Sequence, residues 1–146
     1  MSAEVKTIQF DLVSPEEKLV SEPVRLAVLP GEAGEFGVGA DHVPLVASLS
    51  YGVVKLYAKS LDDMPRSIFV TGGFVDVAGT ECVVLAEDAT DVTDLGSIED
   101  LSSQLDQQIE DVKLAAEEGD RIRMQDQINL TIAKIEAVKN APKSRI

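Results

Sequence analysis

The chain is poor in the side chains from which most catalytic and metal sites are built. It has no tryptophan, one histidine, one cysteine, four phenylalanines and two tyrosines. One cysteine cannot form a disulfide within the chain, and strand alternation in ECVVLA predicts a buried, reduced Cys82 beside Val84 and Ala86. The scarcity of aromatic platforms also argues against a sugar-binding cleft flanked by paired carboxylates.

Long apolar runs and excess positive charge are also missing. No segment approaches the roughly 20 apolar residues that span a bilayer. The first residues, MSAEVKTIQF, have neither the apolar core of a signal peptide nor the Arg/Ser-rich, acid-poor character of a transit peptide. The net charge of −13 argues against nucleic acid or anionic lipid as direct partners. We therefore expect a soluble protein that stays where it is made.

Sequence motifs for catalysis and metal binding are absent as well. There is no Gly-x-Ser-x-Gly nucleophile elbow and no Cys/His metal spacing. The acids Glu87, Asp88, Asp91 and Asp94 lack the alternating ligands and central glycine of an EF-hand loop. We therefore expect no catalytic residue, no metal and no cofactor, and a solvated acidic linker over residues 89–96. An acid-rich hydrolase, the least favoured class, would predict activity in the isolated chain.

The first 88 residues have the character of short strands. In IQFDLV, Ile8, Phe10 and Leu12 alternate with polar residues, as in a strand with one buried face. Turn signals such as Ser21-Glu22-Pro23 and Gly72-Gly73 separate the runs. Seven similar runs follow: Lys18–Val20, Val24–Leu29, Val43–Leu49, Val53–Ala58, Ser67–Thr71, Phe74–Val77 and Cys82–Ala86. This spacing predicts an antiparallel β-sandwich domain over residues 1–88.

Glycine is concentrated between Val28 and Leu49, at positions 31, 34, 37 and 39. Because glycine accepts positive φ, we interpret this segment as a strand, a multi-turn loop and a second strand, with Glu35, Asp41 and His42 on the loop. A phosphate cradle would need Lys-Ser/Thr at a helix start, which is missing here. His42 is interpreted either as a hydrogen-bonding turn residue or as part of a contact loop.

Helical periodicity replaces strand periodicity after Gly96. Ser97 and Asp100 resemble a capping box, Gly119 is positioned to end a first helix, and Asp120 is positioned to cap a second. Apolar residues recur at three- and four-residue steps, which predicts an antiparallel helical hairpin over residues 97–146. The predicted seam consists of Ile98, Leu101, Leu105, Ile109, Val112, Met124, Ile128, Ile132, Ile135 and Val138.

Three ordered blocks carry a family resemblance. The first comprises Leu29-Pro30-Gly31, Gly34-Glu35-Phe36-Gly37-Val38 and His42-Val43-Pro44-Leu45-Val46. The second is Gly72-Gly73-Phe74-Val75-Asp76-Val77, and the third is Val83-Val84-Leu85-Ala86-Glu87-Asp88-Ala89. Together they resemble the epsilon subunit of F-type proton-translocating ATP synthases of the bacterial type. The resemblance spans about residues 10–89.

The resemblance implies a non-catalytic central-stalk (rotor) subunit with a β-sandwich and a C-terminal helical hairpin. Such a subunit binds gamma along one sandwich face, sits on the c-subunit ring, and couples proton translocation to ATP synthesis. Glu35, Phe36, Asp41 and His42 would then belong to the ring-facing loop. The resemblance also implies a peripheral position at the cytoplasmic face of the bacterial inner membrane, with membrane association only through partners.

The same resemblance raises the question of regulation. In many bacterial relatives the hairpin extends into the alpha/beta catalytic head and blocks ATP hydrolysis. Some relatives bind ATP through an Ile/Leu-Asp-x-x-Arg-Ala motif, which here reads Ile98-Glu99-Asp100-Leu101-Ser102-Ser103 and lacks the arginine suited to phosphate. Arg121 and Arg123 are the remaining candidates for an ATP contact. The alternative to a rotor subunit is a free-standing acidic β-sandwich that docks on an unrelated partner.

Overall fold

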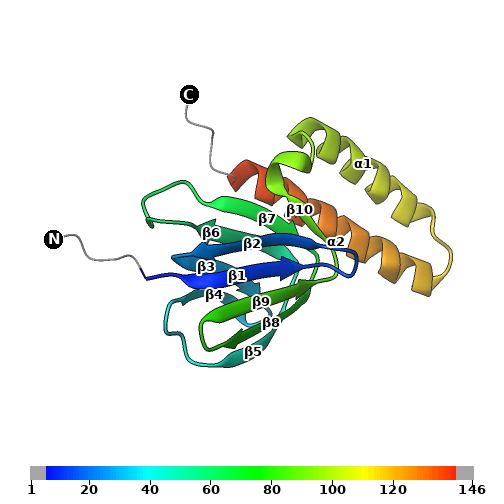
Figure 1. The fold of residues 1–146 in the computed structure, drawn as a ribbon. Coiled ribbons are helices and arrows are strands. Elements are labelled where there is room, and N and C mark those ends of the chain that lie inside the picture. The colour runs from blue at the N-terminus through cyan, green and yellow to red at the C-terminus, as the bar shows by residue number, and fades with distance from the viewer. Residues whose placement is uncertain (1–5, 141–146) are drawn as a thin grey trace. The chain divides into compact units, whose positions relative to one another are not determined.

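The structure, a computed structural model, describes residues 6–140, which fall into two compact units that divide between Thr90 and Asp91. The first unit is built of β-strands, and the second contains the helices (Figure 1). The strands are β1 (Ile8–Val13), β2 (Lys18–Val24), β3 (Leu26–Gly31), β4 (Gly34–Gly39), β5 (Leu45–Leu49), β6 (Gly52–Tyr57), β7 (Arg66–Val70), β8 (Gly73–Ala78), β9 (Glu81–Ala86) and β10 (Ala89–Asp91).

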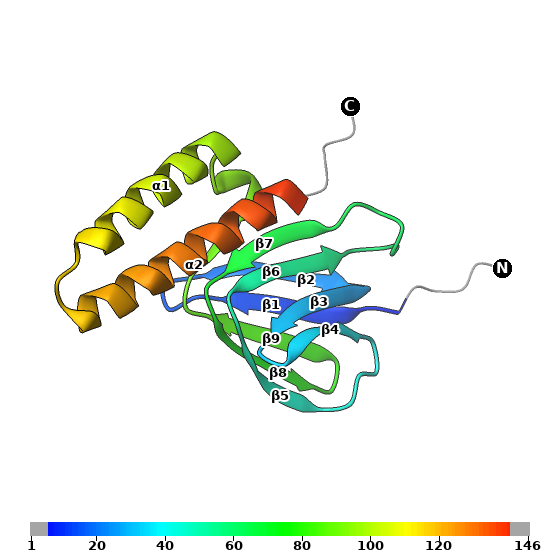
Figure 2. The same cartoon turned by 180° about the vertical axis from the view of Figure 1, so that it is seen from behind.

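The strands form two layers of a β-sandwich. One layer has the order β10-β7-β6-β3-β4 and the other β5-β8-β9-β1-β2, and the residue pair Gly31–Leu49 links β3 to β5. Figure 1 shows β2, β1, β9, β8 and β5 as the near layer, and Figure 2 shows the opposite side, with β7, β6, β3 and β4 in front. The predicted fold class, an antiparallel β-sandwich followed by a two-helix hairpin, is confirmed, although β1 and β9 pair in parallel within the otherwise antiparallel layer.

The inner faces of both layers supply the core of the sandwich. Ile8, Phe10 and Leu12 are buried, as their alternation predicts, and Cys82 is a buried free thiol. Branched side chains dominate this core, because they pack well on pleated sheets. Its other members include Val24, Leu29, Val38, Val54, Val70, Val75, Val77 and Val84.

The glycine-rich segment differs from its prediction. Instead of a multi-turn loop, it contains the edge strand β4, which pairs with β3 in an antiparallel hairpin. A β-carbon at position 37 would lie 3.2 Å from Leu26 Cδ1, and one at position 39 would lie 3.2 Å from the Arg25 carbonyl oxygen. These glycines therefore permit a close approach within the hairpin rather than repeated turning. Glu35 and Phe36 lie on the strand, whereas Asp41 and His42 lie on the loop between β4 and β5.

Strand β2 continues through the predicted turn Ser21-Glu22-Pro23. Its register pairs Pro23 with Gln9 and Glu22 with Phe10 of β1. Because β2 ends the strand order, its far edge pairs with no other strand of residues 6–140, and a proline without an N–H group is tolerated there.

The predicted acidic linker, residues 89–96, contains ordered elements. β10 pairs with β7, and the 3-10 helix η1 (Val92–Asp94) follows with Val92 buried. Just before it, the Thr71 amide donates to the Asp88 carbonyl oxygen over 3.1 Å. Backbone pairing therefore orders the start of this segment despite its charge.

The second unit contains α1 (Ile98–Leu114) and α2 (Glu118–Asn140). As predicted, the Ser97 side chain caps α1 by accepting a hydrogen bond of 3.1 Å from the Asp100 amide. The corner differs, because α1 ends at Leu114, with Ala115 as its C-cap, and Gly119 lies inside the first turn of α2. The Glu117 carbonyl accepts from the Arg121 amide over 3.1 Å, so α2 starts earlier than the glycine suggested. The ends of the two predicted domains, residues 1–5 and 141–146, lie outside the described residues.

Candidate interaction surfaces

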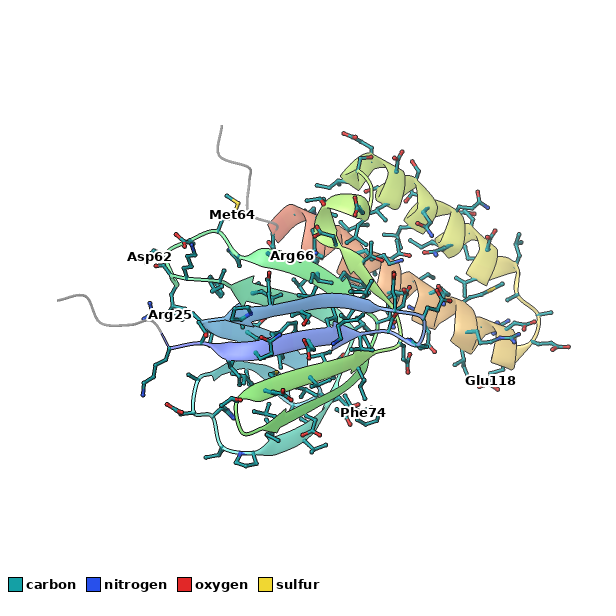
Figure 3. All side chains as sticks on the ribbon, viewed as in Figure 1. Arg25, Asp62, Met64, Arg66, Phe74 and Glu118 are labelled. Carbon is teal, nitrogen blue, oxygen red and sulfur yellow. The ribbon has the colours of Figure 1, made fainter. Side chains whose placement is uncertain are left out.

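The outer face of the layer β5-β8-β9-β1-β2 carries an apolar row. The strand register places Phe74 of β8 opposite Leu85 of β9, and Leu85 opposite Val13 of β1. Phe74 is 57% exposed and Leu85 is 53% exposed, and Phe74 projects from the strand (Figure 3). On β5, Val46 lies on the same face opposite Asp76 and is also exposed. Large apolar side chains gathered on one sheet face are typical of an interaction surface.

A charged row lies beside this apolar row, one pleat away. Val83 of β9 pairs with Asp76 of β8 on one side and with Asp11 of β1 on the other. A hydrogen bond from Ser21 is the main cause that lowers the pKa of Asp11, and Gln9 and Lys18 lower it further. Gln9 Nε2 lies 3.3 Å from Asp11 Oδ1, and Lys18 Nζ lies 4.0 Å from Asp11 Oδ2. Asp11 is therefore a fixed, ionised carboxylate.

A shallow cavity of about 460 Å³ lies beside the β3–β4 turn. Phe36 and His42, two of the four residues predicted to face a c-subunit ring, share its lining, whereas Glu35 and Asp41 are exposed outside it. The full lining consists of Gly31, Glu32, Ala33, Gly34, Phe36, His42, Leu45, Ala47 and Ser48. The structure thus brings Phe36 and His42 together in one cavity, two of the four residues predicted to face a c-subunit ring.

The loop between β4 and β5 has a defined local geometry. Asp41 takes a left-handed conformation with φ 61°, and its carboxylate lies 3.3 Å from Lys6 Nζ. His42 Nδ1 donates to the Val43 carbonyl oxygen over 2.7 Å, since a carbonyl can only accept. In the neutral form of imidazole, a donating Nδ1 makes Nε2 the acceptor. His42 is thus a hydrogen-bonding turn residue that also lines the cavity.

A second group of exposed apolar side chains was missed by the sequence reasoning. Leu61 is 52% exposed and Met64 is 43% exposed, both on the loop between β6 and β7. This loop lies at the same end of the sandwich as Arg25, whose Nη1 donates to the Lys59 carbonyl oxygen over 3.5 Å (Figure 3). The segment LDDMP has a turn signal, and nothing in its periodicity distinguishes it from an ordinary connection.

The predicted seam of the helical hairpin is unevenly buried. Leu101, Ile128 and Ile135 are buried, and Leu105, Ile109, Val112, Met124 and Val138 are half-buried. Ile98 and Ile132 are more than a third exposed. Thr131 is buried in the stripe next to Ile132, and its hydroxyl donates to the Gln127 carbonyl oxygen over 3.0 Å. The threonine satisfies its own polar group within the helix and can therefore occupy an apolar position.

The two candidate ATP contacts occupy different places. Arg121 Nε donates to the Ala115 carbonyl oxygen over 3.0 Å, whereas Arg123 pairs with Asp120. Arg123 also lines a cavity of about 230 Å³ between the helices, together with Gln108, Asp111, Met124 and Gln127. Pockets for drug-sized ligands typically measure about 300–1,000 Å³. The cavity between the helices is smaller than that range. Its lining includes the Asp111 carboxylate and, of the two arginines, Arg123.

Within residues 6–140, no group of three or more His, Cys, Asp or Glu side chains is placed to hold a metal ion. Neither described helix combines the length and apolar character needed to cross a membrane.

Comparison with known proteins gives consistent matches. Residues 7–92 match the family described as ATP synthase, Delta/Epsilon chain, beta-sandwich domain. The ATP synthase epsilon chain of Rhodospirillum centenum is 37% identical over 136 residues, covering 90% of this chain and 91% of that protein. The epsilon chain of Maricaulis maris is 36% identical over 133 residues, covering 90% and 93%. In fold, this chain is similar to a chain in the mitochondrial ATP synthase of Euglena gracilis, with a TM-score of 0.74 at 20% identity over 95% of this chain and 82% of that one.

Proposed function

This chain belongs to the ATP synthase epsilon chain family, and on that basis we propose that it is a non-catalytic rotor subunit of the central stalk. Bound to gamma and to the c-subunit ring, it couples proton translocation to ATP synthesis without touching a substrate. The match covers about nine-tenths of this chain and of its relative, so both the sandwich and the hairpin take part in the comparison. It would be a peripheral protein at the cytoplasmic face of the bacterial inner membrane, held there by its partners.

We place the gamma-binding surface on the outer face of β5-β8-β9-β1-β2. The observation that carries this assignment is the exposed pair Phe74–Leu85, which lies side by side on the central strands of the layer. An aromatic ring and a leucine exposed together favour burial by a partner, because burying either side chain contributes roughly 1.5–3 kcal/mol.

We place the ring-facing surface at Glu35, Phe36, Asp41 and His42. These residues come from β4 and from the loop that follows it, and Phe36 and His42 share the cavity beside the β3–β4 turn. The mixture of exposed acids, a hydrogen-bonded histidine and a partly buried ring suits polar loops of a partner better than an apolar ridge.

For the hairpin we propose a mainly structural role, with modest inhibition of ATP hydrolysis through the alpha/beta head. ATP binding would be weak at best, since position 102 is serine and Arg121 is engaged at the helix corner. The free-standing interaction module is the alternative function, and co-purification with ATP synthase subunits would separate the two.

The gamma assignment is tested by reconstitution of the full chain with purified gamma. We expect a complex at micromolar concentrations, and at least tenfold weaker binding for the double variant Phe74→Ser/Leu85→Ser. The matched control is Leu61→Ser/Met64→Ser, which removes similarly exposed apolar side chains from the β6–β7 loop. Equal binding by both double variants would move the interface elsewhere, and no complex with the native chain would count against the proposed function itself.

A further inference from the structure

The face proposed to bind gamma has two chemically different rows. Along one row, the register aligns Val13, Leu85 and Phe74 on adjacent strands. Along the next row, two residues away on each strand, it aligns Asp11, Val83 and Asp76. Two carboxylates therefore flank one valine in the middle of the sheet face, directly beside the apolar row.

These aspartates occupy unusual positions for their residue type. Asp is depleted in strands, and both residues lie within strands rather than at their ends. Asp11 is held by Gln9 and Ser21, so its carboxylate does not simply extend into solvent. Its contact with Lys18 spans 4.0 Å, and the Lys18 side chain is 57% exposed, so a better-placed cation can replace it.

The rows also differ in what they require of a partner. Docking an apolar ridge over Leu85 and Phe74 brings the same partner surface over Val83 and removes water from the neighbouring carboxylates. A carboxylate that loses water without gaining a cation or a hydrogen-bond donor opposes binding. A partner can therefore cover the apolar row favourably only when it also supplies positive charge to the two aspartates of the acidic row.

We propose that Asp11 and Asp76 receive lysine or arginine side chains of the protein that covers Leu85 and Phe74. This inference rests on the proposed function, which identifies that protein as gamma. The partner surface would present an apolar ridge with basic residues along one side. The apolar row would supply affinity, and the acidic row would set the orientation and speed the encounter.

The test compares association of the native chain, Asp76→Asn, Asp11→Asn and the double variant with purified gamma at low and moderate salt. We expect the double variant to bind about tenfold more weakly at low salt, mainly through slower association, and to show a flatter salt dependence. The matched control is Asp62→Asn, which removes one exposed acid from the β6–β7 loop (Figure 3). We expect that control to change the affinity less than twofold.

The possible results separate this inference from the proposed function. If Asp62→Asn weakened binding as much as Asp76→Asn did, net charge alone would steer association. That result would overturn the inference. Native-like affinity and salt dependence of the double variant would also overturn it. If Phe74→Ser/Leu85→Ser weakened binding at least tenfold in that case, the proposed interface would stand. Thermal denaturation checks each variant, and if Asp11→Asn unfolds, Asp76→Asn alone decides.

Discussion

The side chain of Arg121 donates from Nε to the backbone carbonyl of Ala115, 3.0 Å away, so the second helix closes the C-terminal end of the first. The last carbonyls of a helix lack partners within the helix, and a cationic donor both satisfies one and complements the helix dipole. Arg121, one of the two remaining candidates for an ATP contact, thus has a local structural task in this chain.

Replacing Arg121 by alanine is expected to destabilise the hairpin corner by about 0.5–1.5 kcal/mol. The control is Arg123→Ala, which breaks an exposed pair with Asp120 and should cost about 0.3 kcal/mol. Amide hydrogen exchange at the end of α1 measures the difference directly. Faster exchange in the Arg123 variant than in the Arg121 variant would contradict this assignment.

Gly73 and Gly119 should respond in opposite ways to alanine. Gly73 has φ 144°, and an added β-carbon would overlap the Leu85 carbonyl oxygen, so Gly73→Ala should destabilise the sandwich by about 2–4 kcal/mol. Gly119 lies in α2 with nothing within 4 Å of an added β-carbon, so Gly119→Ala should stabilise the helix by about 0.5–1 kcal/mol. Urea denaturation followed by circular dichroism measures both, and equal midpoints would refute the contrast.

Stability should depend on Cys82 at alkaline pH. Burial is the main cause that raises the pKa of this thiol from 9.0 to about 12, and Asp76 adds to it. Its contribution is fully present below about pH 9 and is lost as pH rises toward 12, because the unfolded chain ionises first. Between these values, the free energy of unfolding should fall faster in the native chain than in Cys82→Ala, by about 1.4 kcal/mol per pH unit. Parallel pH profiles would show that the thiol is not buried.

Cysteines at positions 35 and 42 report on the proposed ring-facing surface. In the assembled enzyme, Glu35→Cys and His42→Cys should crosslink to c-subunit loops, whereas Asp62→Cys on the β6–β7 loop serves as the comparison site. Crosslinks from positions 35 and 42 only to the catalytic head would invert the proposed orientation. Glu35→Ala should impair coupling more than folding, since an exposed acid contributes little to stability.

Truncation after Asp94 tests the role of the hairpin. The shortened chain retains β10 and η1 and loses both α-helices. We expect ATP hydrolysis by the complex to rise by less than about threefold, because the regular apolar stripes of the hairpin favour a compact form. A many-fold rise would show that the hairpin is a strong brake.

Sequence periodicity predicted most of the fold, and its failures have local causes. Alternation at Ile8, Phe10 and Leu12 marks a strand with one buried face, and capping by Ser97 marks the start of α1. β4 was missed because Gly37 and Gly39 are consistent with a loop until their close approach to β3 is known. Pro23 suggested a turn because proline is excluded from central strands. That β2 is an edge strand is known only from the strand order.

The interaction surfaces were only partly predictable. Outward-facing apolar residues such as Leu85 alternate with buried ones and therefore suggest a second covered face. The alignment of Asp11 with Asp76 on either side of Val83 depends on pairings between strands far apart in the chain. The hydrogen bond from Arg121 at the helix corner likewise depends on where the turn between α1 and α2 lies. Gly119 had suggested a different position for that turn.

The parallel pairing of β1 with β9 affects how the chain folds during synthesis. Residues 9–13 pair with residues 81–85, and Figure 1 shows β1 lying between β2 and β9. As the chain leaves the ribosome, β1 and β2 can form a hairpin early, but β1 must wait for more than 60 further residues before its other edge is covered. Until then the β1 edge is open to pairing with a neighbouring nascent chain.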